Sequence, residues 1–202
     1  MAKVGMIGAG SWGIALAKLL YNNGNEVTVW SALEDEITML QTEREHKDKL
    51  PGVALPEDMI FTVDLETAMK DKDMLVLAVP SPFVRSTAAR MKEFLPKGQI
   101  VVNVAKGIEE KTLTTLSGVI EDELPFADVA VLSGPSHAEE VGRQIPTTIV
   151  VGARSRETAE YIQNLFMSEV FRVYTSPDVL GIEIGAALKN VVALAAGIAD
   201  GL

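Results

Sequence analysis

Several residue types are scarce in this chain, and each scarcity argues against a class of function. Cysteine is absent from the 202 residues, so neither a disulfide framework nor a thiolate metal site is available. The two histidines, His46 and His137, are too few for a typical zinc site, and His46 lies in a charged run where we expect a solvated side chain. The formal net charge of −10 disfavours a nucleic-acid or anionic-membrane surface. No stretch approaches the roughly 18 uncharged residues of a membrane-spanning helix, so we expect no metal, nucleic-acid or membrane partner.

Glycine, by contrast, is concentrated near the start of the chain. An apolar, strand-like run from Lys3 leads into Gly8, Gly10 and Gly13, and an apolar helix begins near Ser11. In a dinucleotide-binding strand–turn–helix unit, the first glycine permits the tight turn, the second lets the backbone approach a pyrophosphate, and the third lets the helix pack close to the strand. The glycines also interrupt the apolar run, which a secretory signal would keep continuous. The segment therefore predicts a dinucleotide site in a cytoplasmic protein.

Strand-like and helical patterns then alternate along the chain. The run Met74 to Val79 is continuously apolar, as expected of a parallel strand buried on both faces, and Asp64 is suited to cap a short helix that ends at Lys70. Further strands are predicted at 27–30, 60–63, 100–104, 129–132, 147–151 and 171–174, and further helices at 34–49 (with a loop), 83–95, 113–123 and 157–166. This order predicts an α/β fold, a doubly wound Rossmann-type sheet, over residues 1–177.

The last segment, residues 178–202, carries no strand pattern. It reads as one long, almost wholly apolar helix, interrupted by Glu183, Lys189 and Asn190. A helix that is apolar all round belongs inside a larger body. We expect it to be the first helix of a helical substrate domain that is mostly missing from this sequence. Its exposed apolar face, from Ile182 to Ile198, would then favour a homodimer or aggregation.

Two lysines are placed where a ligand would be expected. Ligands of open α/β sheets bind beyond the carboxyl ends of the strands. Pro80 follows one predicted strand at this edge, Lys106 follows the next, and the segment 133–137 follows a third. Lys189 lies in the apolar helix, where an unpaired charge is costly and usually reflects function or a specific partner.

Five segments together resemble the bacterial-type NAD(P)-dependent glycerol-3-phosphate dehydrogenases. They are Gly8-Ala-Gly-Ser-Trp-Gly-Ile-Ala-Leu-Ala17, Ala78-Val-Pro-Ser81, Asn103-Val-Ala-Lys-Gly-Ile108, Ser133-Gly-Pro-Ser-His-Ala-Glu-Glu140 and Ala187-Leu-Lys-Asn-Val191. Their order and spacing match across the whole chain, which corresponds to the family's amino-terminal domain and its passage into the helical domain. The resemblance implies reversible hydride transfer between NAD(P)H and dihydroxyacetone phosphate, giving sn-glycerol 3-phosphate for phospholipid synthesis.

The resemblance also implies roles for individual residues. Ser11, Trp12 and Ala138 would contact the cofactor beside Gly8, Gly10, Gly13 and Pro80, while Lys106 would touch both cofactor and substrate. Gly134 and Ser136 would hold the substrate, and Lys189 would be the acid/base with Asn190 adjacent.

The chemistry explains why two lysines are useful. Reduction of a ketone creates an alkoxide, so a donor must supply a proton at the carbonyl oxygen. An unperturbed lysine, with a pKa of about 10.4, returns that proton reluctantly near neutrality. We expect burial among apolar side chains and repulsion from Lys106 to lower the pKa of Lys189.

The sequence allows alternatives for the preferred cofactor and for the activity of the chain alone. The second strand is followed by Ser31-Ala32-Leu33 without an arginine, which weakens the case for NADP and slightly favours NADH; Glu34 or Asp35 either reaches the ribose or caps the next helix. The resembled family also grips the substrate phosphate mainly through an arginine–asparagine segment and an aspartate that would lie beyond Leu202. We therefore expect this chain alone to be inactive or weakly active. The alternative is a stand-alone dinucleotide-binding module without catalysis.

Overall fold

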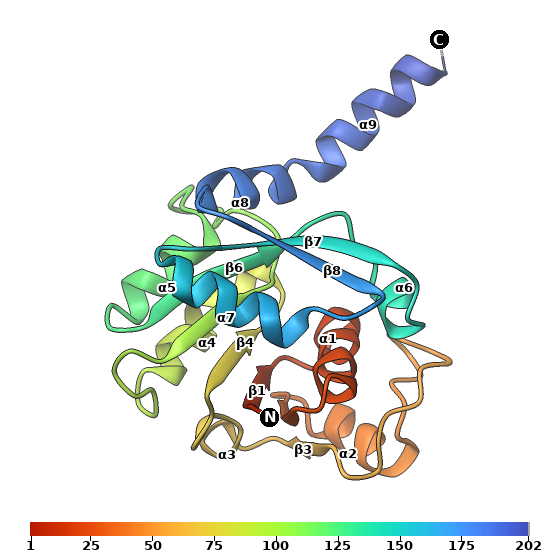
Figure 1. Ribbon diagram of the computed structural model, residues 1–202, viewed down its shortest axis with the longest axis vertical. Helices are drawn as coiled ribbons and strands as arrows, with labels where there is room; N and C mark the ends of the chain where they lie inside the picture. The colour runs from red at the N-terminus through yellow and green to blue at the C-terminus, as the bar shows by residue number, and fades with distance from the viewer. Residues whose placement is uncertain (202) are drawn as a thin grey trace.

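The computed structural model describes residues 1–201 and is built around one eight-stranded sheet (Figure 1). The strand order is β3-β2-β1-β4-β5-β6-β7-β8, and every neighbouring pair is parallel except β6 and β7, which are antiparallel. The strands are β1 (Lys3–Ile7), β2 (Glu26–Trp30), β3 (Ile60–Thr62), β4 (Met74–Leu77), β5 (Ile100–Asn103), β6 (Asp128–Ser133), β7 (Thr147–Ala153) and β8 (Phe171–Ser176). The predicted doubly wound Rossmann-type sheet is confirmed. The strands match their predicted positions to within two residues at each end.

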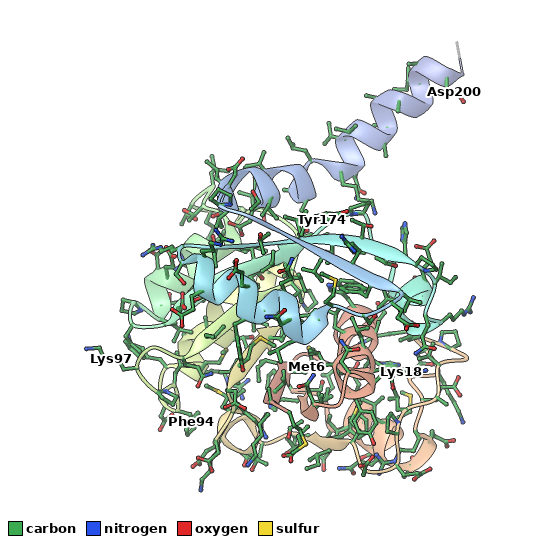
Figure 2. The ribbon with its side chains drawn as sticks, in the orientation of Figure 1. Met6, Lys18, Phe94, Lys97, Tyr174 and Asp200 are labelled. Carbon is green, nitrogen blue, oxygen red and sulfur yellow. The ribbon has the colours of Figure 1, made fainter. Side chains whose placement is uncertain are left out.

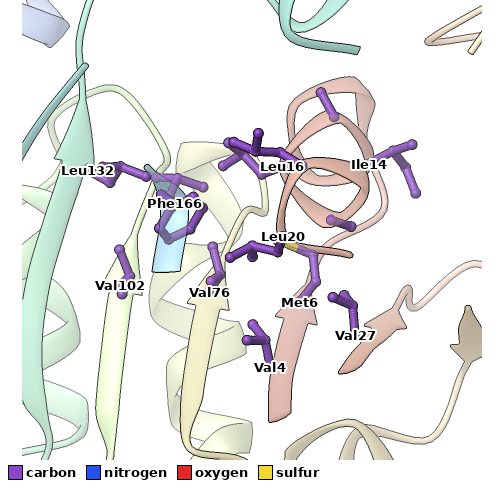
Figure 3. Close-up of a cluster of buried hydrophobic side chains, with 14 of the residues drawn as sticks. Val4, Met6, Ile14, Leu16, Leu20, Val27, Val76, Val102, Leu132 and Phe166 are labelled. Carbon is purple, nitrogen blue, oxygen red and sulfur yellow. The ribbon is translucent and has the colours of Figure 1, made fainter. Parts of the chain in front are cut away.

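Helices cover both faces of this sheet. They are α1 (Ser11–Asn22), α2 (Glu34–Glu43), α3 (Leu65–Met69), a 3₁₀ turn η1 (Ser81–Phe83), α4 (Val84–Met91), α5 (Leu116–Glu123), α6 (Ala138–Gly142), α7 (Arg156–Phe166), α8 (Val179–Ala187) and α9 (Lys189–Asp200). Because successive strand residues point to opposite faces, Met6 joins a core with Leu16 of α1 and Phe166 of α7 (Figure 3). Its neighbour Ile7 joins a second core, on the other face, with residues of α3, α4 and α5.

Local signals explain where the helices begin. Asp64 caps α3 as predicted, since its carboxylate accepts hydrogen bonds from the backbone N–H groups of Glu66 and Thr67. The helix predicted from Leu113 begins three residues later, because Thr115 caps it through the N–H of Gly118 and Leu113 has a left-handed φ of 59°. The helix predicted over 83–95 ends at Met91.

The C-terminal segment differs from the single helix that the sequence predicted. Leu188, with ψ near −3°, interrupts it, and the axes of α8 and α9 differ by 52°. Helix α8 stays against the sheet, whereas α9 extends away from it with Asp200 at the far end (Figure 2). The apolar face expected to be exposed between Ile182 and Ile198 is exposed in α9, where Val191, Val192 and Leu194 face solvent.

Within residues 1–201, no single helix is both long enough and apolar enough to cross a bilayer. The α8–α9 pair meets that requirement only in combination, across its bend.

Candidate active site

The carboxyl ends of β1, β4, β5 and β6 meet at one edge of the sheet, where the loops that follow them enclose cavities. The largest has a volume of about 560 Å³ and is lined by Gly10, Trp12, Pro80, Lys106 and Ser136, among others. Ligands bind at this edge in open α/β sheets. The structure thus brings most of the predicted cofactor residues together around one cavity.

The three glycines of the first turn meet different demands. Gly8 has a φ of +125°, and a Cβ atom there would lie 2.6 Å from the carbonyl oxygen of Ala78. A Cβ on Gly13 would collide with the carbonyl oxygen of Gly8. Gly10 has an ordinary φ of −66°, and within residues 1–201 a Cβ there would meet no atom closer than 4 Å. The fold therefore requires glycine at 8 and 13, whereas the space beside Gly10 is open.

A second observation at this cavity also fits a bound dinucleotide. The indole Nε1 of Trp12 is buried and has no hydrogen-bond partner within the described chain, and buried polar groups normally have one. Gly10 forms the N-terminal boundary of α1, whose first N–H groups and positive dipole end suit a pyrophosphate. The residues present therefore fit an NAD(P) cofactor, whose pyrophosphate Gly10 and the start of α1 would hold.

Next to it, at the end of β2, lies a second cavity of about 360 Å³. Its lining includes Ser31, Glu36, Lys49 and Arg90. The carboxylate of Glu36 is buried and accepts hydrogen bonds from Ser31 Oγ, Lys49 Nζ and, at 2.9 Å, His46 Nε2. Burial opposes ionisation of Glu36, but the hydrogen bonds from Lys49, Ser31 and His46 outweigh it and lower its pKa.

This arrangement corrects two expectations about the region after β2. His46 is not solvated: it is 1% exposed because its ring lies against Glu36. Glu34 and Asp35 occupy the first turn of α2 but do not line the cavity at the end of β2, and neither side chain caps the helix in the described structure. The acid that faces this cavity is Glu36. The cations are Lys49 and Arg90, which the sequence analysis missed because both are distant from the second strand in sequence.

A third cavity, of about 440 Å³, is bordered by β6, β7 and the helices α8 and α9. Lys106, Ser133, Gly134 and Lys189 line it together. The Nζ of Lys106 donates a hydrogen bond of 3.1 Å to the carbonyl oxygen of Gly134. The pKa of Lys106 is lowered mainly by burial and, to a smaller extent, by repulsion from Lys189. Lys106 lines both this cavity and the largest one, so a single ammonium group faces the predicted cofactor and substrate positions.

The remaining predicted residues are placed as follows. Lys189 is exposed at the start of α9, so the apolar burial expected for it is not found in this structure. Ser136 and Ala138 line the largest cavity, and Ser136 Oγ donates to the carbonyl oxygen of Gly134 at 3.4 Å. Asn190 is exposed beside Lys189. Gly134 lines the cavity of the two lysines.

An ion-pair network that the sequence analysis missed holds the loop after Lys106. Arg85 binds the carboxylate of Glu109 with two hydrogen bonds of 2.7 Å and reaches Glu123 at 2.8 Å. The hydrogen bonds from Arg85, followed by the one from Thr112, lower the pKa of Glu109 to about 2. Because Glu109 is three residues from Lys106, the network restrains the loop that carries the ammonium group.

Comparison with known proteins agrees with this geometry. Residues 3–159 match the family model for the N-terminus of NAD-dependent glycerol-3-phosphate dehydrogenase, and residues 178–202 match the model for its C-terminus. Over 202 residues the chain is 64% identical to glycerol-3-phosphate dehydrogenase [NAD(P)+] of Agathobacter rectalis, and over 204 aligned residues it is 56% identical to that of Fusobacterium nucleatum. All of this chain is covered in both cases, against 60% and 61% of the relatives.

A solved structure extends the comparison to three dimensions. The crystal structure of glycerol-3-phosphate dehydrogenase from Coxiella burnetii superposes with a TM-score of 0.92 at 30% identity, over 99% of this chain and 61% of that one. The chain thus spans about 60% of the length of the relatives that it matches. On the strength of both family models and these relatives, the chain belongs to the NAD-dependent glycerol-3-phosphate dehydrogenase family.

Proposed function

We propose that this protein catalyses reversible hydride transfer between NAD(P)H and dihydroxyacetone phosphate, giving sn-glycerol 3-phosphate for glycerophospholipid synthesis in the cytoplasm. The observation that carries the proposal is the position of Lys106, which lines both the cavity of the glycine turn and the cavity that it shares with Lys189. Membership of the family supports the same chemistry.

In this proposal the nicotinamide supplies the hydride, and side chains of the protein stabilise the developing negative charge and supply the proton. The Lys106 and Lys189 ammonium groups attract the phosphorylated substrate into a cavity whose other lining is largely apolar. As hydride reaches the carbonyl carbon, negative charge develops on its oxygen, and a nearby ammonium group stabilises it and donates a proton. We assign that proton to Lys189 and a charge-stabilising role to Lys106. Gly134 lines this cavity, and Ser136 lines the neighbouring cavity of the glycine turn and donates to the carbonyl oxygen of Gly134. Asn190 follows the proposed acid in the chain, and we assign all three residues to the substrate.

Lys189 also affects how readily Lys106 gives up a proton. Lys106 has a lowered pKa, from burial and from Lys189. An acid is most effective when its pKa lies near the working pH. We expect an anionic substrate beside Lys106 to change its protonation. A Lys189→Ala variant that kept near-normal turnover would refute the assignment of Lys189.

For the cofactor, the cavity at the end of β2 favours the phosphorylated form. The Glu36 carboxylate already accepts three hydrogen bonds, one of them from Lys49, and the exposed Arg90 adds a second positive charge at the same cavity. A ribose 2′-phosphate requires cations at this place, and a free 2′-hydroxyl favours an available acid. We therefore propose a preference for NADPH, opposite to the preference that the sequence around Ser31 suggested.

Residues 1–202 alone are proposed to bind dinucleotide well and to turn over slowly. The glycine-turn cavity is built from residues before 140, whereas the substrate cavity depends on Lys189, which is exposed. NADPH titration and an NADPH-oxidation assay with dihydroxyacetone phosphate, run on the same sample, test this. Binding with little turnover supports it and, for this chain, the alternative of a binding module; rapid turnover contradicts both.

The apolar side chains of α9 also bear on assembly. Val191, Val192, Leu194 and Ile198 are all more than half exposed, and apolar patches of this kind favour association. We propose that the 202-residue chain forms a homodimer through α9. Sedimentation of a Val192→Glu and Leu194→Glu double variant as a monomer, beside a dimeric parent, would support this.

A further inference from the structure

The cavity between the sheet and α8 contains a hydroxyl group that the chemistry described so far does not use. Ser133 is the last residue of β6 and is 4% exposed. Within residues 1–201 its Oγ has no hydrogen-bond partner. Hydroxyl groups buried in this way normally have a partner, so an orphaned one at a cavity indicates a missing ligand.

The pairing of the strands shows which way this side chain points. Val131 pairs with Gly152 across β6 and β7, and a Cβ atom on Gly152 would meet the side chains of Ile182 and Val179. That face of the sheet is therefore the face covered by α8. Because strand side chains alternate with a period of two, Ser133, two residues after Val131, points to the same face.

The cavity beside Ser133 exists because α8, which faces it, carries small residues there. Gly181, Gly185 and Ala186 of α8 line the cavity with Ser133, and a Cβ on Gly185 would meet no described atom within 4 Å. At the same cavity lie the ammonium groups of Lys106 and Lys189. The cavity therefore offers two cations and one neutral hydroxyl.

The proposed substrate presents three kinds of polar group to such a cavity. Its carbonyl oxygen, which becomes negative during reduction, is best paired with the two ammonium groups, and its charged phosphate is bound better by cations than by a neutral hydroxyl. Its terminal hydroxyl is neutral and can both donate and accept a hydrogen bond, as can a serine hydroxyl. We propose that Ser133 binds the unphosphorylated hydroxymethyl group of the substrate and so selects for a ketone that carries this hydroxyl. The inference rests on the proposed function.

The test compares the natural substrate with an analogue that lacks the hydroxyl. Acetol phosphate replaces the hydroxymethyl group of dihydroxyacetone phosphate with a methyl group. In protein expressed from the whole reading frame, Ser133→Ala should lower kcat/KM for dihydroxyacetone phosphate by about 10-fold, the size expected for one neutral hydrogen bond. It should leave kcat/KM for acetol phosphate unchanged, because that substrate cannot make the bond.

Two further variants separate binding from structure. Ser168→Ala removes another buried hydroxyl without a partner in the described chain, outside the cavities of the active site, and should change neither substrate. Ser133→Thr keeps the hydroxyl and should preserve the selectivity. The melting temperature of Ser133→Ala should equal that of the parent, since Ser133 Oγ has no partner within residues 1–201 to lose.

The possible results separate a failure of the role proposed for Ser133 from a failure of the proposed function. A parent protein that reduces dihydroxyacetone phosphate, with a Ser133→Ala variant that loses the same factor on both substrates or on neither, would overturn the role of Ser133 and leave the proposed function standing. A folded parent that fails to reduce dihydroxyacetone phosphate would refute the proposed function and the inference with it. A fall confined to the natural substrate supports both.

Discussion

Gly10 offers the most direct separation of binding from folding in this protein. An added Cβ there would meet no atom of residues 1–201 within 4 Å, and the residue has a φ of −66° that alanine adopts without strain. Alanine is a poorer N-cap than glycine, but it also lowers the entropy of the unfolded chain, and the two effects nearly cancel. We expect Gly10→Ala to change the free energy of unfolding by less than about 0.5 kcal/mol, or roughly 1–2 °C in Tm.

The same substitution should weaken dinucleotide binding strongly. The methyl group would occupy the space above the start of α1 where a pyrophosphate approaches. Overpacking of this kind costs about 1–3 kcal/mol, so we expect about 10-fold or more loss of affinity. Fluorescence titration with NADPH measures it, beside a thermal melt of the same sample.

Gly13→Ala is the matched control, because its Cβ would collide with the Gly8 carbonyl oxygen instead of a ligand. It should lower the free energy of unfolding by about 2 kcal/mol, or roughly 4–8 °C in Tm. If Gly10→Ala binds NADPH as tightly as the parent, the pyrophosphate does not pass over Gly10 and our account of the glycine turn is wrong.

Three other groups give testable predictions. Lys189→Met should raise the pKa of Lys106, because repulsion from Lys189 helps to lower it; an unchanged NMR titration of the Lys106 side chain would contradict this. Glu109, with its pKa lowered from 4.5 to about 2, stabilises the fold above about pH 4.5, and this contribution disappears as the pH falls toward 2. Arg85→Gln should therefore flatten the dependence of Tm on pH across that range, and parallel curves for parent and variant would refute the role of the pair. Lys49→Met should weaken NADPH binding by about 10-fold and NADH binding little, as expected for loss of one phosphate contact; equal losses would show that Lys49 does not reach the 2′-phosphate.

Much of the sheet could be predicted because its signals are local. A parallel strand covered on both faces, such as β4 with the sequence Met-Leu-Val-Leu, is continuously apolar. The glycine turn is equally local, since its strand, turn and helix are consecutive in the chain. The caps at Asp64 and Thr115 act over two or three residues. Because the carboxyl ends of parallel strands meet at one edge of a sheet, the sequence also predicts which loops lie together there.

The expectations that failed depended on contacts between distant segments. His46 is in a charged run, and only the packing of that run against α2 buries it on Glu36. Arg90 reaches the end of β2 from α4, with its guanidinium 5.2 Å from the centre of the Trp30 ring. Sequence spacing gave no indication of either contact. The break at Leu188 was missed because the surrounding residues are uniformly apolar, without a proline to mark the end of a helix.

That break has a consequence for the two lysines. Helix α8 is tied to the sheet domain by Glu183, whose buried carboxylate accepts hydrogen bonds from the N–H and Oγ of Ser117 at the start of α5. Lys189 begins α9 directly after the break, so the contact of α8 with α5 helps to determine how far Lys189 lies from Lys106. The cavity of the glycine turn, by contrast, is lined by residues of the sheet domain alone. Displacement of α8 would therefore alter the substrate cavity and the pKa of Lys106 while leaving the dinucleotide cavity intact, which is why binding and turnover are separable properties of this chain.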